Sequence, residues 1–415
     1  MSVEKADAVV VGAGLAGLAC ARGLASRGLD VLVLEAGDAV GGRVRTDHVD
    51  GYTLDRGFQV LNTGYPEVQR VVDLAALDLR PFDPAAGVRV HGERVLLANP
   101  VRRPSGAGAA LGLPVGGIGG KAALGLYAGL CATLPVAGIK HRDDLSAAEA
   151  WRRASIPQDV VDGVLRPFFS GVLLEQDLST TRRFTDLMMR MFVRGESTVP
   201  AGGMQALPEQ LAAGLPAGTV RLGTPVCEVA PGRVGTAAGT VEARAVVVAT
   251  DGWAAARLLP GGLTAPPARG VTTVYHAVPD FPEATATLLL DEPSSPVANT
   301  IVLSKAAPEY APPGRALVAT SMVHGTLPAD VDGDDVRAAL ARLHGTDTSG
   351  WELVAAYDLP QALPGMPAPH PLRKPVRVGE VYVAGDHRDT SSIQGALVSG
   401  RRAATAVLQD VGAAA

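Results

Sequence analysis

Hydrophobic positions near the start of the chain form short continuous runs on either side of one helical segment. Residues 6–11 and 31–34 are apolar and rich in valine and leucine, which predicts two buried strands. The segment 15–27 between them predicts a helix that ends at Gly28. Strand, helix and strand in this order are typical of an α/β fold. Further apolar runs predict strands at 220–222, 225–229, 241–251 and 381–384.

The pattern changes between residues 260 and 370, where short runs alternate apolar and polar residues. This alternation predicts an antiparallel sheet with one buried face. Elsewhere the pattern predicts helices at 65–74, 120–134, 146–154, 160–169, 182–193, 205–214 and 331–343. Since 415 residues exceed the usual size of one core, we expect two domains. The first comprises 1–75, 200–260 and 371–415, and the second, an α+β domain of antiparallel sheet and helices, comprises 76–199 and 261–370.

Composition then excludes several classes of function. The chain has 37 Lys and Arg against 42 Asp and Glu and no basic cluster, so nucleic acid is not an expected partner. Its three cysteines are far apart and lack the spacing of a metal site, so we expect no metal. The first apolar run reads as a strand rather than a signal peptide, which favours a cytoplasmic location.

One apolar stretch leaves two interpretations open. Residues 105–139 are rich in Gly, Ala and Leu, with Lys121 as their only charge. Gly and Pro divide this stretch into pieces too short to span a bilayer. It is either a helix of the second domain, which we favour, or a surface in peripheral contact with a membrane. The sequence makes no prediction of the oligomeric state.

The turn after the first strand carries the first candidate chemistry. Gly12, Gly14 and Gly17 form a GxGxxG motif, in which the glycines permit a tight turn, close approach to a pyrophosphate, and close packing of the helix on the strand. Leu15 and Ala16 begin that helix, whose free N–H groups favour a phosphate. Glu35, followed by Ala36, ends the second strand, where a carboxylate accepts hydrogen bonds from a ribose 2′-OH. The motif therefore predicts a dinucleotide without a 2′-phosphate, FAD or NAD.

A second glycine turn separates these two cofactors. Gly41, Gly42, Arg43 and Arg45 follow Glu35 and resemble the second glycine motif of the flavoprotein superfamily of flavin amine oxidases, protoporphyrinogen oxidases and phytoene desaturases. The resemblance implies a Rossmann-like FAD-binding domain of the GR2 type, with non-covalent FAD. It places this turn along the FAD pyrophosphate, where the two arginines can neutralise charge.

Three further segments match the same superfamily. The Asp55-Arg56-Gly57-Phe58 segment fits the family's Asp-x-Gly turn near the flavin ring, and Val226 lies where the family's backbone contacts adenine. The C-terminal segment 385–401 resembles the family's terminal FAD motif, in which Gly385 and Asp386 approach the ribityl phosphate. A helix beginning near residues 394–395 then points its N-terminus at the flavin ring, which stabilises negative charge on the reduced ring. The residues that the resemblance places there are Ile393, Gln394, Gly395 and Ala396.

The substrate is less explicit than the cofactor. Where amine oxidases of the superfamily keep an aromatic residue in the terminal motif, this chain has Ser392, and aromatic residues are only 4% of the chain. Lys305 is the single candidate for the lysine that such oxidases keep near the flavin. The Phe- and Met-rich segment 184–192 reads as core, with an adaptable pocket as the alternative. We therefore expect an FAD-dependent oxidoreductase acting on a hydrophobic, isoprenoid or polycyclic small molecule; an amine oxidase and a non-catalytic lipid-binding relative remain alternatives.

Overall fold

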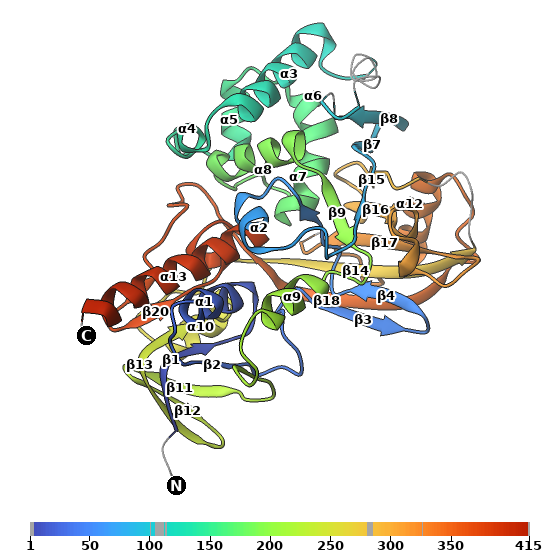
Figure 1. Ribbon diagram of the computed structural model, residues 1–415. Helices are drawn as coiled ribbons and strands as arrows, with labels where there is room; N and C mark the ends of the chain where they lie inside the picture. Colours follow the sequence, from blue (N-terminus) through green and yellow to red (C-terminus); the bar gives the residue numbers. More distant parts are fainter. Residues whose placement is uncertain are drawn as a thin grey trace.

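The computed structural model describes residues 4–99, 101–103, 112, 114–279, 285–325 and 327–413. Its helices and strands form two main sheets, each built from segments far apart in sequence, and a group of helices that covers one end (Figure 1). Within the stretch 105–139, residues 105–111 and 113 lie outside the described residues. Among the described residues, no helix is both long and apolar enough to cross a bilayer.

The first sheet has the parallel centre that the N-terminal pattern predicts. Strand β1 pairs in parallel with β2 and β13, and β13 pairs in parallel with β20. The strand order is β10-β2-β1-β13-β12-β11, with β20 and β19 attached beside β13. The bounds are β1 Glu4–Val11, β2 Val31–Leu34, β10 Val220–Arg221, β11 Val226–Ala230, β12 Arg233–Thr236, β13 Gly239–Val248, β19 Arg377–Val378 and β20 Val381–Val383.

Helices cover this sheet because its central strands are apolar on both faces. Val10 packs with the core beneath α1 (Leu15–Ala25) and α13 (Ile393–Ala413), whereas Val9 and Val11 pack with Ala255 of α10 (Gly252–Leu258). Helices α1 and α13 cross closely at Gly400, where a Cβ would lie 2.1 Å from the Ala16 carbonyl oxygen. The two ends of the chain are thereby joined in one unit, near α9 (Ala206–Ala213) (Figure 1).

The second sheet has seven strands in the order β18-β14-β17-β16-β15-β7-β8. It is antiparallel as predicted, except that β15 and β7 pair in parallel. One face packs on α12 (Asp334–His344) through residues such as Val274 and Leu340. The other face contributes residues such as Tyr275 and Ile301 to the main hydrophobic core. The bounds are β7 Ala85–Val90, β8 Glu93–Ala98, β14 Ala268–Pro279, β15 Leu288–Leu290, β16 Asn299–Val302, β17 Arg315–Val323 and β18 Glu352–Pro364.

The helical end of the molecule lies opposite β1 and β2 in Figure 1. It contains α3 Gly117–Thr133, α4 Val136–Lys140, α5 Ala147–Arg153, α6 Gln158–Val160, a π-helical turn Val161–Leu165, α7 Arg166–Leu173 and α8 Arg182–Arg194. The single helix predicted at 160–169 is thus interrupted. Pro167 at the start of α7 has no N–H to donate, which accounts for an irregular turn before it.

Short elements connect these parts. They are the hairpin β3 Thr46–Val49 and β4 Tyr52–Asp55, the three-stranded sheet of β5 Leu61–Asn62, β9 Ser197–Pro200 and β6 Leu79–Pro81, and the helices α2 Pro66–Val71 and α11 Leu303–Ala306. The alternation of apolar residues around Tyr52 and Leu54 is typical of such a hairpin. The strands β5, β6 and β9 are too short to show a periodic pattern, and the sequence does not predict them. Both main sheets are discontinuous in sequence, as the predicted domains require; the domain boundaries themselves stay a prediction.

Candidate active site

The first glycine turn leaves the start of α1 open. Gly12 has φ +102°, and a Cβ there would lie 3.0 Å from the Ala249 carbonyl oxygen. A Cβ on Gly17 would lie 1.9 Å from the Gly12 carbonyl oxygen, so only glycine lets the helix pack against the turn. Gly14 occupies the N-cap position of α1 without a side-chain cap, and no acidic residue lies in the first turn. The first N–H groups of α1 therefore remain for an anion.

The second glycine turn lies directly against the first. The Gly41 N–H donates to the Ala13 carbonyl oxygen at 2.9 Å, and Gly14 and Gly41 form an isolated parallel bridge. The Glu35 carboxylate accepts hydrogen bonds from the backbone N–H groups of Ala13 and Gly37, each at 2.7 Å. These contacts fix the carboxylate beside the turn, as ribose recognition requires.

Arg43 joins this turn to two distant parts of the chain. Its Nη2 lies 2.8 Å from Asp386 Oδ2 in the C-terminal segment, and its Nη1 donates to the Ala362 carbonyl oxygen of β18 at 2.7 Å. In the C-terminal segment, Gly385 has φ +146° and its N–H donates to Ser399 Oγ at 2.8 Å. One guanidinium thus connects both chain ends of the first sheet with the second sheet.

A single cavity of about 1320 Å³ extends from these turns into the space between the two sheets and the helices. This volume exceeds that of an ordinary pocket for one ligand. The predicted site residues that line it are Gly12, Gly14, Leu15, Ala16, Glu35, Ala36, Gly41, Gly42, Arg43, Gly57, Phe58, Val226, Gly385, Asp386, Ile393 and Ala396. The structure therefore brings together five sequence segments that the motifs had only placed in order.

The wall of the cavity also offers polar atoms to a cofactor. Asp386 Oδ1 and Ser391 Oγ are buried, line the cavity and have no hydrogen-bond partner among the described residues. Buried polar atoms rarely stay unpaired. Together with the uncapped start of α1 and the glycines, these atoms fit a dinucleotide cofactor.

Five predicted residues do not line the cavity. Gly17 and Gly395 act in packing, since a Cβ on Gly395 would lie 1.8 Å from the Thr390 carbonyl oxygen. Arg45 is turned away from the cavity and pairs with Asp38 at 3.0 Å. The Gln394 side chain instead accepts a hydrogen bond from the Glu67 N–H at 2.9 Å. Lys305 lies in the short helix α11, outside the cavity wall.

The far part of the cavity is apolar and aromatic. All six phenylalanines among the described residues line it, although aromatic residues are scarce in the chain. They are Phe58, Phe82, Phe168, Phe169, Phe184 and Phe192. Along α8, Leu187 and Met191 belong to the core, whereas Phe184 and Met188 also face the cavity. The segment predicted as core therefore serves both as core and as pocket wall.

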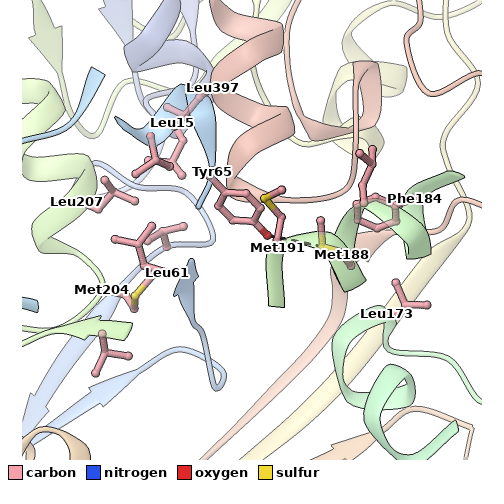
Figure 2. Close-up of a cluster of buried hydrophobic side chains, with 14 of the residues drawn as sticks. Leu15, Leu61, Tyr65, Leu173, Phe184, Met188, Met191, Met204, Leu207 and Leu397 are labelled. Carbon is pink, nitrogen blue, oxygen red and sulfur yellow. Dashed lines mark hydrogen bonds between the residues drawn. The ribbon is translucent and has the colours of Figure 1, made fainter. Parts of the chain in front are cut away.

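Tyr65 extends this apolar wall toward the first sheet. Figure 2 shows its hydroxyl directed at Met188, with an oxygen–sulfur distance of 3.6 Å. Burial raises the pKa of Tyr65 to about 12, so the phenol is neutral at physiological pH. Among the described residues no lysine lines the cavity. Its charged residues on the helical side include the ion pair Arg102–Glu196, whose partial exposure indicates an opening to solvent.

Several lining residues escaped the sequence analysis. Thr250 and Asp251 follow β13 and reach the cavity beside Val226, as does Arg257 of α10. The apolar run that ends at this turn is the only sequence signal for them. The residues of α7 carry no motif at all, because an apolar pocket wall has the same pattern as a core helix.

A parallel dinucleotide-binding sheet that shares one cavity with an apolar compartment is the arrangement expected of an oxidoreductase that uses a dinucleotide cofactor. A sequence model of the flavin containing amine oxidoreductases matches residues 15–408. The chain therefore belongs to this family, and FAD is its cofactor.

Individual relatives include proteins of different activities. Putrescine oxidase of Kocuria rosea is 31% identical over 264 residues, which cover 59% of this chain and 54% of that protein. Coproporphyrinogen III oxidase of Bacillus subtilis (strain 168) is 28% identical over 188 residues, covering 41% and 37%. The matches thus span about half or less of these relatives. The structure of cyclohexylamine oxidase from Brevibacterium oxydans IH-35A superimposes with a TM-score of 0.75 at 18% identity, over 98% of this chain and 99% of that one. At this level of identity the similarity shows a shared fold alone.

Proposed function

We propose that this chain removes two electrons from an apolar, isoprenoid or polycyclic small molecule and transfers them to non-covalent FAD. One observation carries the proposal: the cofactor turns open into a compartment walled by six phenylalanines and two methionines, with no lysine among its described residues. Such a wall binds apolar surface and excludes water. Family membership supports catalysis over the alternative of a non-catalytic lipid-binding relative.

In this proposal the chain binds the cofactor through its two glycine turns. The uncapped start of α1 faces the diphosphate, and the fixed Glu35 carboxylate accepts the ribose hydroxyls. Arg43, held by Asp386 and the Ala362 carbonyl oxygen, adds a positive charge whose position is set from both sheets.

FAD supplies hydride acceptance when it is bound. The protein contributes orientation and a favourable field for negative charge. The N-terminus of α13, beginning at Ile393, lies in the cavity wall, where its dipole favours an anion. The phenylalanines hold the donor carbon of the substrate in a dry compartment, which favours hydride transfer through proximity. The proton that the substrate also loses passes to water at the opening beside Arg102 and Glu196.

An amine oxidase is the second candidate, and a specific observation favours it. Putrescine oxidase is among the relatives in sequence, and Glu196 and Asp83 in the cavity wall are carboxylates suited to an ammonium group. Against it, the cavity wall has no lysine among the described residues, and Ser392 stands where such oxidases keep an aromatic residue.

The test measures the anaerobic reduction of the bound flavin through the loss of its absorbance. The panel is putrescine, cyclohexylamine, coproporphyrinogen III, protoporphyrinogen, a phytoene-like polyene and NAD(P)H. Bleaching by the polyene or a porphyrinogen supports the proposal, whereas bleaching by amines alone overturns it in favour of the second candidate. Phe184→Ser should slow reduction by the apolar substrate, while Leu187→Ala, on the same helix but outside the cavity wall, should not.

The family comparisons leave location open, and we propose a cytoplasmic protein in peripheral contact with a membrane. The support is the outer face of α3, where Ile118 is 87% and Leu126 is 77% exposed. Sedimentation with liposomes tests this contact: Leu126→Asp should release the protein, and unchanged sedimentation would contradict it.

A further inference from the structure

A row of polar side chains crosses the cavity face of the second sheet. In the registers of neighbouring strands, Thr273 of β14 is opposite Ser321 of β17, and Ser321 is opposite Asn299 of β16. Residues directly opposite each other project on the same face. We call Thr273, Ser321 and Asn299 the polar row. Their neighbours along the strands on this face, Tyr275 and Ile301, are an aromatic and an aliphatic residue.

One end of the polar row contacts the proposed cofactor region. Thr273 Oγ1 accepts a hydrogen bond from the Phe58 N–H at 3.3 Å, and Phe58 lines the cavity after the Gly57 turn. Asn299 lies two strands away, roughly 10 Å at the usual strand spacing. The row therefore leads from the cofactor turn into the apolar compartment.

The other end of the row is an amide without a partner. Asn299 is 5% exposed, lines the cavity, and its Oδ1 has no hydrogen-bond partner among the described residues. The amide lies against Gly171 inside helix α7, where a Cβ would come within 2.4 Å of Asn299 Nδ2. Glycine disfavours a helix interior, so this position serves to make room for the amide. Ser321, 4% exposed, lines the cavity beside it.

Burying an amide oxygen without a hydrogen-bond partner costs free energy, unless a bound ligand supplies the missing donor. No ion pair or charged hydrogen-bond partner of Asn299 or Ser321 occurs among the described residues, so a charged ligand group would lack compensation here. We propose that Asn299 and Ser321 determine specificity by binding a neutral hydrogen-bonding group, a hydroxyl, carbonyl or pyrrole-type N–H, on an otherwise apolar substrate. This rests on the proposed function and narrows its substrate class.

The test uses binding to the oxidised holoenzyme, which needs no turnover. The dissociation constants of 2-naphthol, naphthalene and 2-naphthylmethylamine are measured anaerobically from the perturbation of the flavin spectrum. The wild type should bind 2-naphthol about 10-fold more tightly than naphthalene, as expected for one buried hydrogen bond. Asn299→Leu should remove this preference while leaving naphthalene binding in place.

Two further variants separate chemistry from shape. Ile301→Val also lines the cavity but removes no polar atom, so it should shift both neutral ligands alike and keep the preference. Ser321→Ala should reduce the preference, and it serves where Asn299→Leu does not fold.

Three results would overturn the inference: no preference in the wild type, an undiminished preference in Asn299→Leu and Ser321→Ala, or the tightest binding for the amine. Failure of the flavin-reduction panel would count against the proposed function alone, because these binding constants are obtained without any reaction.

Discussion

Asp55 provides a stability test that follows directly from the structure. Its side chain is 1% exposed and ends strand β4, next to the turn that reaches the cavity. Its Oδ1 accepts hydrogen bonds from Thr46 Oγ1 at 2.6 Å and the Met204 N–H at 2.8 Å, and its Oδ2 accepts one from the Tyr310 hydroxyl at 2.9 Å. Burial nevertheless dominates these contacts and raises the pKa of Asp55 to about 6.

The sign of the pH dependence follows from this raised pKa. Between about pH 3.8 and 6, the unfolded chain has released the proton of Asp55 while the folded chain still holds it. The free energy of unfolding therefore falls as the pH rises through this window, by about 3 kcal/mol at 1.36 kcal/mol per pKa unit. An unfolding entropy of about 2.1 cal/mol/K per residue converts this to about 3 °C in Tm for a chain of this length.

The assay compares the Tm of the wild type and of Asp55→Asn by calorimetry from pH 4 to pH 7.5. Asparagine stays neutral, so the Tm of the wild type relative to the variant should fall by about 3 °C as the pH rises. Asp47→Asn is the matched control, because the Arg56 guanidinium lowers the pKa of Asp47 and its contribution is lost only as the pH falls. A difference for Asp55→Asn that stays constant within 1 °C would refute the reasoning.

Further variants test the cofactor turns. Arg43→Ala should weaken FAD binding at least 10-fold, because a positive charge at the cavity wall is lost; titration of the apoprotein, followed by flavin fluorescence, measures this. Arg45→Ala, outside the cavity wall, should weaken FAD binding less than 3-fold. Equal losses of affinity in the two variants would contradict this placement of the arginines. Gly17→Ala should prevent FAD retention during purification, since its Cβ would lie 1.9 Å from a carbonyl oxygen. Its control is Gly125→Ala in α3, where no atom lies within 4 Å of the added Cβ and unfolding should become harder by about 0.5–1 kcal/mol.

The cofactor half of the site was predictable because its chemistry depends on the backbone. Close approach of a pyrophosphate demands glycine at fixed spacing, and such spacing is visible in a sequence at Gly12, Gly14, Gly41 and Gly42. The directions of flexible side chains are not visible in this way. Arg45 and Gln394 lie in the correct motifs, yet Asp38 and the Glu67 N–H provide partners that turn them from the cavity.

The substrate half depends on side chains that any core also uses. Phe184 and Leu187 are three residues apart on α8, and only the structure separates the one that lines the cavity from the one that does not. Composition is an equally weak guide, since aromatic residues are only 4% of the chain, yet every described phenylalanine lines the cavity. Lys305, the candidate for a lysine near the flavin, does not line the cavity. Its position in the sequence between two strands does not indicate which way its side chain points.

The contacts of Arg43 also imply that cofactor and substrate binding are not independent. The same guanidinium donates to Ala362 in β18 of the second sheet and to Asp386 beside the first. Next to β18 in that sheet, β14 carries Thr273, which binds the Phe58 N–H and begins the polar row. A shift of the turns that carry Arg43 and Phe58 would therefore disturb both of these contacts with the second sheet, because packed interiors transmit strain. On this argument, loss of FAD should weaken binding of apolar ligands even at positions, such as Asn299, that the cofactor turn does not touch.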